Sequence, residues 1–304
     1  MRENRGAYAG VVFALLAAVG FSAKAILVKL AYQDRVDTIT LLALRMAFAM
    51  PFFAVVALWI RRQHAAPMNW HDRLLVLGLG LVGYYLSSLF DFLGLQYITA
   101  GLERLILFLY PTLTVMLAAL IYRRAIGKRT LMAMALSYAG IALVFLHDAG
   151  NRQAASILLG AALVFASTLS YSVYLVGAGH AIARIGAARF TSYAMIIAST
   201  ACLLQFGATH PLSALELPLR VYEYAIAMAV FSTVLPVFLL SYAIRHIGSA
   251  HASLIGSIGP VSTIYLAYLF LNEPVTLLQL AGAMLVMSGV LIISLSRNQA
   301  GAIK

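Results

Sequence analysis

The sequence predicts an all-α integral membrane protein with ten transmembrane helices arranged as two inverted five-helix repeats. Three observations lead to this fold class: a very apolar composition, ten long apolar runs and an internal repeat. Of the 304 residues, 63% are hydrophobic and 10% are charged, whereas about 25% are charged in a soluble domain. So few charges cannot cover the surface of a soluble enzyme or of a nucleic-acid-binding domain. The single cysteine, Cys202, excludes an intramolecular disulfide and a cysteine-based metal site.

Each apolar run is long enough to cross the hydrocarbon core of a bilayer, which takes about 20 residues in a helix. A helix satisfies its own backbone hydrogen bonds in lipid, and the runs lack the alternation of β-barrel strands. The first run is longer than the core of a signal peptide, so we interpret it as an uncleaved helix. The predicted spans are Tyr8–Leu30, Thr38–Ile60, Asp72–Leu93, Thr99–Ile121, Thr130–Leu146, Ser156–Gly177, Ala188–Phe206, Val221–Ala243, Ser249–Leu271 and Thr276–Leu295.

The basic residues orient this bundle. Fourteen Lys and Arg residues fall in the segments on one side of the predicted membrane, and three fall in the segments on the other side. Because short cytoplasmic loops carry the excess of basic residues, both termini are predicted to face the cytoplasm. We therefore expect a multi-pass protein of the cell's inner (plasma) membrane. The net charge of +11 follows from this topology and does not indicate a nucleic-acid partner.

An internal repeat relates the two halves of the chain, which we expect to be residues 1–150 (helices 1–5) and 151–304 (helices 6–10). Five spans are an odd number, so the second half would enter the membrane upside down, as in many transporters. The alternative is chance similarity among apolar helices. At an offset of 149 the matches are Leu105 with Leu254, Ile106 with Ile255, Pro111 with Pro260, Thr114 with Thr263 and Gly140 with Gly289, and Gly10 matches Gly160 at 150.

Several of these segments resemble the EamA family of the drug/metabolite transporter superfamily. The resemblance implies a ten-helix bundle that moves small organic metabolites, often outward, without ATP hydrolysis. One departure is clear, because Arg124 stands where family members often carry a glutamate after the fourth span. The residues that carry the resemblance are Phe21-Ser22, Lys29-Leu30, Leu44-Arg45-Met46, Ala252-Ser253-Leu254-Ile255, Pro260, Leu271-Asn272-Glu273-Pro274, Leu280-Ala281-Gly282 and Ser288-Gly289-Val290.

A polar stripe in the third span indicates a candidate binding surface. Tyr84, Ser87, Ser88 and Asp91 share one helix face with Gly80, and such a face must meet protein or water rather than lipid. We interpret it as the wall of a substrate cavity. The alternative is a hydrogen-bonded contact between helices, for which Ser and Gly are equally suited.

Ionisable residues within the spans are costly and are therefore functional candidates. Arg45 has apolar helical neighbours, and we expect it to form a structural ion pair with Asp91 or Glu103. Arg104 adjoins Glu103, about 100° away around the helix, so one of the two is expected at the interface. Lys24 would then be the unpaired cation, which predicts a substrate with a carboxylate or similar group. The alternative is that Asp91 pairs with Lys24 and that the cavity suits apolar or cationic drugs.

The remaining candidates lie mostly in the second half. Ser167, Tyr171 and Tyr174 share one face of the sixth span, where tyrosines can bind an organic substrate or anchor the membrane interface. Ser257 lies among small residues of the ninth span. Three prolines predict kinks that serve either as hinges or as packing features. The predicted substrate-binding residues are Lys24, Tyr84, Ser87, Asp91, Glu103, Tyr171, Tyr174 and Ser257, and the predicted hinges are Pro111, Pro236 and Pro260.

These features favour a secondary transporter of a small organic metabolite, with an amino acid or organic acid as substrate, export as direction and alternating access as mechanism. The alternatives are a membrane enzyme acting on lipids and a transport-inactive scaffold. No phosphate-binding loop or His-Glu-x-x-His motif occurs, so we expect no ATP hydrolysis, cofactor or metal. Membrane lipids surround such a bundle, and the sequence leaves a homodimer open.

Overall fold

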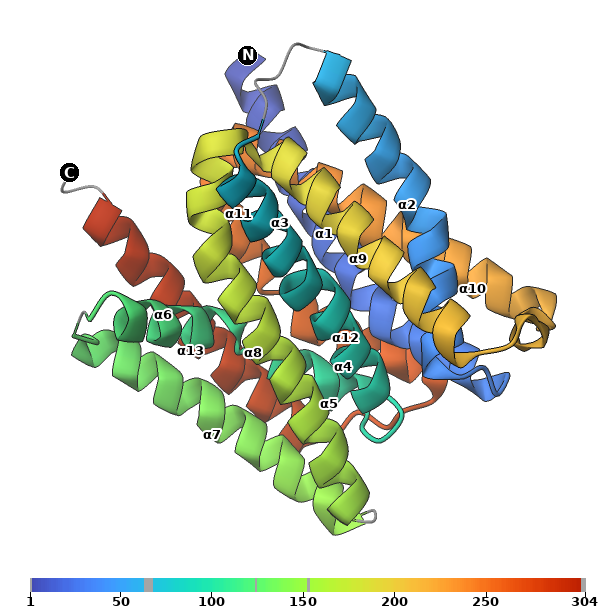
Figure 1. The fold of residues 1–304 in the computed structure, drawn as a ribbon. Helices are drawn as coiled ribbons and strands as arrows, with labels where there is room; N and C mark the ends of the chain where they lie inside the picture. The colour runs from blue at the N-terminus through green and yellow to red at the C-terminus, as the bar shows by residue number, and fades with distance from the viewer. Residues whose placement is uncertain (1, 63–67, 124, 152–153, 302–304) are drawn as a thin grey trace.

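The computed structural model describes residues 2–62, 68–123, 125–151 and 154–301, and every regular element in these ranges is helical (Figure 1). The elements are α1 (Arg2–Gln33), α2 (Thr38–Arg62), α3 (Trp70–Gly80), η1 (Leu81–Leu86), α4 (Ser87–Gly94), α5 (Ala100–Leu107), α6 (Tyr110–Ile121), α7 (Lys128–Asn151), α8 (Ala154–Ile185), α9 (Ala187–Thr209), η2 (Leu212–Leu215), α10 (Leu219–Ala229), η3 (Val230–Val234), α11 (Leu235–Gly256), α12 (Gly259–Leu271) and α13 (Leu277–Gly301).

Within the described residues, nine segments are long and apolar enough to cross a membrane. They coincide with the first nine predicted spans to within a few residues at most ends. The tenth predicted span, Thr276–Leu295, is occupied by α13, whose described apolar stretch, Leu277–Ile293, is shorter than the others. The prediction of a multi-pass helical protein is therefore confirmed.

Two spans are broken at positions that the sequence marked with proline. The fourth span divides into α5 and α6, and the ninth continues from the end of α11 into α12. Pro111 and Pro260 each lie in the first turn of the helix that follows the break. Proline has no backbone N–H, so the carbonyl four residues earlier loses its helical donor. Each break contains backbone hydrogen bonds of the tighter i→i−3 pattern: Leu109 N–H donates to Ile106 O at 3.0 Å at the first, and Ser257 N–H donates to Leu254 O at 3.3 Å and Ile258 N–H to Ile255 O at 3.2 Å at the second.

The third and eighth spans each contain a π-helical turn. In the third span η1 separates α3 from α4, and in the eighth span η3 separates α10 from α11. Pro236, the third predicted hinge, is the second residue of α11, two residues after the end of η3. Such turns are rare, and they occur mostly where a helix carries a functional site. The sequence analysis did not predict them.

Helix boundaries repeat at the offset found in the sequence. The starts of α9, α10, η3, α12 and α13 each lie 149 residues after the starts of α2, α3, η1, α6 and α7, respectively. An offset that aligned a few prolines and glycines thus also aligns caps, π-turns and helix breaks.

Helices pack reciprocally across the two halves (Figure 1). Helix α1 packs on α11 and α12, while its counterpart α8 packs on α4 and α6; α2 packs on α9, and α7 on α13. Glycine permits the α7–α13 approach, because a Cβ at Gly140 would lie 2.6 Å from the carbonyl oxygen of Gly282. Each half therefore buries its apolar faces largely against the other half.

Candidate functional site

A cavity of about 400 Å³ lies between the two halves, with walls from α1, α2, α4, α5, α8, α9 and α11. Its volume is in the range that holds a small organic molecule. Alanine, phenylalanine, methionine, leucine and valine side chains form much of the wall; hydroxyl groups come from both halves, and the charged groups come from the first half. Six of the predicted binding residues line it, namely Lys24, Tyr84, Ser87, Asp91, Tyr171 and Ser257.

Both halves contribute to the wall at matched positions. The lining pairs at an offset of 149 are Met46 with Met195, Gly83 with Ser232, Tyr84 with Thr233, Ser88 with Val237, Asp91 with Leu240, Leu107 with Gly256 and Phe108 with Ser257. At an offset of 150 between α1 and α8, they are Ala17 with Ser167, Ala18 with Thr168 and Phe21 with Tyr171. The cavity is therefore a property of the repeat rather than of one helix.

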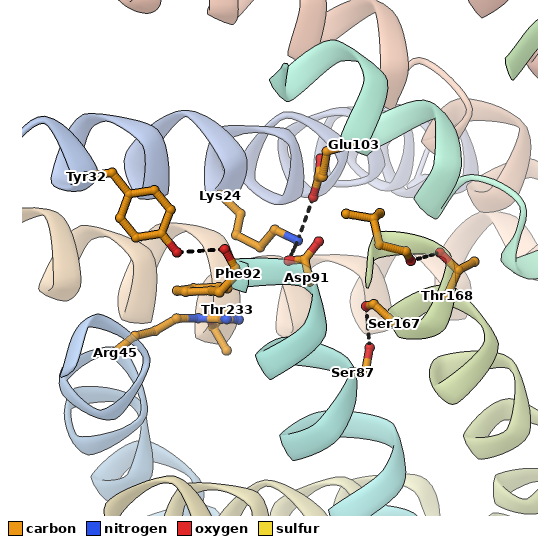
Figure 2. Close-up of polar contacts among 11 residues, drawn as sticks. Lys24, Tyr32, Arg45, Ser87, Asp91, Phe92, Glu103, Ser167, Thr168 and Thr233 are labelled. Carbon is orange, nitrogen blue, oxygen red and sulfur yellow. Dashed lines mark hydrogen bonds and ion pairs between the residues drawn. The ribbon is translucent and has the colours of Figure 1, made fainter. Parts of the chain in front are cut away.

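Lys24 lies between two carboxylates at one end of this cavity. Its Nζ is 2.5 Å from Asp91 Oδ2 and 3.0 Å from Glu103 Oε1, and the three side chains converge from α1, α4 and α5 (Figure 2). Glu103 has no exposed surface and stands behind Lys24, outside the cavity wall. Burying an ammonium is tolerated because both carboxylates compensate it. Of the two pairings weighed from the sequence, the structure contains Lys24 with Asp91.

The predicted ion pair of Arg45 was wrong. Among the described residues no carboxylate lies within ion-pair distance of its guanidinium. Its Nε instead donates to Thr233 Oγ1 at 3.2 Å, and its guanidinium carbon lies 5.3 Å from the centre of the Phe92 ring (Figure 2). Both nearby acids are already engaged by Lys24, so Arg45 is left as a buried cation of the cavity wall. Lys24 is not the unpaired charge that the sequence suggested.

Arg104 also lines the cavity, although the sequence analysis did not assign it to the binding site. Its guanidinium carbon lies 5.4 Å from the centre of the Phe108 ring. A Cβ at Gly259 would lie 2.9 Å from Arg104 Nη2, so the glycine at the α12 break leaves room for this guanidinium. Adjacent residues on a helix diverge, and sequence alone could not decide whether Glu103 or Arg104 faces inward.

Tyrosines form a cluster beside the cavity. The hydroxyls of Tyr84 and Tyr174 are 2.9 Å apart, and the Tyr171 and Tyr174 rings are stacked with centroids 5.5 Å apart. Tyr174 is 4% exposed and is not part of the wall, so it supports Tyr84 and Tyr171 from behind. Tyr174 was predicted to contact the substrate directly, but in this arrangement its side chain does not reach the cavity.

Hydroxyl groups connect the halves around the cavity. Ser87 and Ser167 are hydrogen-bonded at 3.0 Å across α4 and α8 (Figure 2). Ser257 lies in the break between α11 and α12, where its hydroxyl donates to Leu254 O at 2.6 Å. Thr233, which holds Arg45, was missed from the sequence. It lies 149 residues after Tyr84, so the repeat offset was the signal that could have found it.

A second cavity, of about 520 Å³, lies at the C-terminal end of α1 and is lined by Lys29, Tyr32, Arg35 and Glu273, among others. Lys29 Nζ is 3.3 Å from Glu273 Oε1, and Glu273 also accepts the Ala100 N–H at 3.2 Å. At this end of the bundle, Glu273 of the second half therefore connects to two segments of the first half. Among the described residues no cluster of His, Cys, Asp and Glu is suited to a metal ion.

Comparison with known proteins identifies the family. A Bacillus subtilis protein named uncharacterized transporter YcbK is 31% identical over 91% of this chain and 90% of its own length. An uncharacterized transporter from Archaeoglobus fulgidus is 25% identical over 84% of this chain and 88% of its own. A protein crystal structure at 16% identity shares the fold, with a TM-score of 0.61 over 96% of this chain and 98% of that one. The EamA-like transporter family matches residues 8–146 and again 158–295, so the chain is a membrane protein that belongs to the EamA-like transporter family.

Proposed function

We propose that this chain is a secondary transporter that moves a small organic metabolite across the inner membrane by alternating access. The observation that carries the proposal is the central cavity, which is lined at matched positions by both halves and adjoins the two helix breaks. Transporter sites of this kind lie between inverted repeats and beside discontinuous helices. The proposal includes ten membrane helices in two inverted repeats, with both termini in the cytoplasm.

Export is the proposed direction. Along α1, the lining runs from Ala14 to Lys24, through the middle of the helix, and the ion pair of Lys29 with Glu273 lies beyond it toward the C-terminal end. With a cytoplasmic N-terminus, the cavity would receive substrate from the cytoplasm while that ion pair is closed. The ion pair of Lys29 with Glu273 then lies on the outer side and would open when the substrate leaves. Rocking of the two halves about their shared interfaces would alternately open the cavity to the cytoplasm and to the outside.

Flux through reconstituted protein tests the proposal. Purified protein in phospholipid vesicles, loaded with a panel of amino acids and organic acids, should exchange at least one labelled compound faster than protein-free vesicles do. Leu240→Trp places a large ring in the cavity and should lower that flux at least tenfold. The matched control is Leu235→Trp on the same helix, which is 39% exposed and outside the cavity wall.

The outcome separates the proposed function from its alternatives. Flux that Leu240→Trp blocks and Leu235→Trp leaves intact supports transport through this cavity. Folded protein without flux for any compound would instead favour the lipid enzyme or the inactive scaffold. Equal flux in both variants would place the substrate path elsewhere in the bundle.

A further inference from the structure

The charges around the central cavity do not balance. Three basic side chains (Lys24, Arg45 and Arg104) and two acidic side chains (Asp91 and Glu103) lie in or directly behind its wall. Both carboxyl groups are within 3.0 Å of the Lys24 ammonium, so that charge is compensated within the protein. An arginine keeps its charge in proteins, and neither guanidinium has a carboxylate within ion-pair distance among the described residues, so the cavity wall carries uncompensated positive charge.

Arg45 is held so that part of its guanidinium stays without a hydrogen-bond partner. The residue is 7% exposed, its Nε donates to Thr233, and its guanidinium carbon lies over the Phe92 ring. Its Nη1 is buried, and among the described residues it has no hydrogen-bond partner. A buried charged donor without a partner is costly, which indicates that another group satisfies it during function.

Arg104 repeats this arrangement on the neighbouring wall. It packs on Phe108, beside the space that Gly259 leaves, and its buried Nε has no hydrogen-bond partner in the described part of the chain. The two arginines come from α2 and α5, so they reach the same cavity from different helices. Guanidinium groups bind carboxylates through paired, charge-assisted hydrogen bonds, and aromatic stacking keeps their planes oriented.

We propose that Arg45 and Arg104 form the substrate's anion site and that the substrate is an organic monocarboxylate with an apolar body. This inference rests on the proposed transport function. A carboxylate supplies the negatively charged acceptors that the two guanidiniums lack among the described residues, whereas a zwitterion brings a second cation and a dianionic phosphate costs more to bring out of water into a largely apolar cavity. The apolar body fits beside Phe21, Met195 and Leu240, on the uncharged part of the wall. Lys24, with its two carboxylates, is then a structural element rather than the substrate's partner.

Ligand binding to detergent-purified protein tests this assignment without requiring flux, because a ligand that binds the folded state raises its unfolding temperature. The probes are monocarboxylates from butyrate to phenylacetate, their primary amides, phenyl phosphate and 2-phenylethylammonium. At least one carboxylate should bind at least tenfold more tightly than its own amide, and the phosphate and the ammonium should bind less tightly. This comparison uses the unaltered protein and so does not depend on the folding of a variant.

Substitutions locate the site. Arg45→Gln and Arg104→Gln should each weaken carboxylate binding at least tenfold and leave amide binding unchanged. Arg45→Lys should recover only part of the loss, because it keeps the charge and loses the paired geometry. Arg62→Gln is the matched control, since Arg62 lies on the same helix as Arg45 but is exposed and outside both cavities.

The results separate this proposal from the transport function. Equal affinity for carboxylates and amides, or carboxylate binding that survives both Gln variants, would overturn the anion site. Flux confined to neutral or cationic compounds would also overturn it while leaving transport intact. Carboxylate binding that needs both arginines, in a protein without flux, would support the anion site and overturn the proposed function.

Discussion

The two halves of the molecule share their helix pattern and differ in their chemistry. Around the central cavity, charged residues of the first half match neutral positions of the second half: Lys24 corresponds to Tyr174, Arg45 to Ala194, Asp91 to Leu240, Glu103 to Ala252 and Arg104 to Ser253. In the same two halves, breaks and π-turns recur at matched positions. The two halves thus share their helix boundaries, while the charged residues of the cavity wall come from the first half.

The largest expected effect is a loss of stability when the charge of Lys24 is removed. Lys24→Met leaves Asp91 and Glu103 buried without their ammonium, and removal of one partner of a buried pair costs about 3–5 kcal/mol. At the matched position, Tyr174→Phe removes only a neutral hydrogen bond with Tyr84, which contributes about 1 kcal/mol. Thermal unfolding in detergent should therefore show a much greater loss for Lys24→Met.

A neutralised triple variant provides the control for that prediction. Lys24→Met combined with Asp91→Asn and Glu103→Gln removes all three charges, so most of the lost stability should return. If Lys24→Met alone unfolds at the wild-type temperature, or if the triple variant is less stable than the single one, the three groups do not act as a compensated cluster.

The sequence was sufficient to predict the membrane-spanning helices of the fold. Runs of about 20 apolar residues can only be helices in lipid, and nine of the ten predicted spans are long apolar helices in the described part of the chain. Pro111 and Pro260 were predicted as kinks from their missing backbone donors, and both lie at helix breaks, although Pro51 lies inside the continuous helix α2. The π-turns were not predicted, since no residue type requires them and they depend on packing between helices.

The sequence alone could not predict which charged side chains pair with each other. Lys24, Asp91 and Glu103 come from three helices, and their meeting depends on the relative rotation of α1, α4 and α5. A rotation of about 100°, one residue on a helix, exchanges Glu103 for Arg104 at the cavity wall. The sequence therefore identified the ionisable residues within the spans, but it assigned Arg45 a carboxylate partner where the structure has Thr233.

A smaller effect tests the packing that the halves share. Gly140 and Gly289 are matched, and a Cβ at these glycines would lie 2.6 Å from Gly282 O and 2.5 Å from Ala133 O, respectively. Gly140→Ala and Gly289→Ala should each separate α7 from α13 and destabilise the protein by about 1–3 kcal/mol, the usual cost of overpacking. Unlike the charge substitutions, the two variants should have similar effects on the unfolding temperature.

Gly150→Ala is the matched control on α7. A Cβ there meets nothing within 4 Å, so the substitution should leave stability unchanged or raise it slightly through better helix propensity. A loss confined to only one of Gly140→Ala and Gly289→Ala would show that the α7–α13 contact is not equivalent in the two halves.

The smallest effect concerns a pair of hydrogen bonds that relates each half to the helix break of the other. Ser22 on α1 donates to Gly259 O at 3.0 Å, and Ser172 on α8 donates to Tyr110 O at 3.3 Å. Tyr110 and Gly259 are the first residues of α6 and α12, and they are matched at the offset of 149. Ser22 and Ser172 are matched at 150, so the two bonds form a reciprocal pair.

Ser22→Ala and Ser172→Ala should each cost about 0.6 kcal/mol, the average for an interhelical side-chain hydrogen bond in a membrane protein. Each serine has one hydroxyl hydrogen, which it shares between the carbonyl of the other half and the carbonyl four residues earlier in its own helix. Ser241→Ala is therefore the control, because Ser241 makes only that local bond in the described structure. If the breaks act as hinges, the double variant should alter the rate of flux more than it alters stability. Equal changes in all three single variants would assign these bonds to the local helices and leave the breaks without a hydrogen-bonded link between the halves.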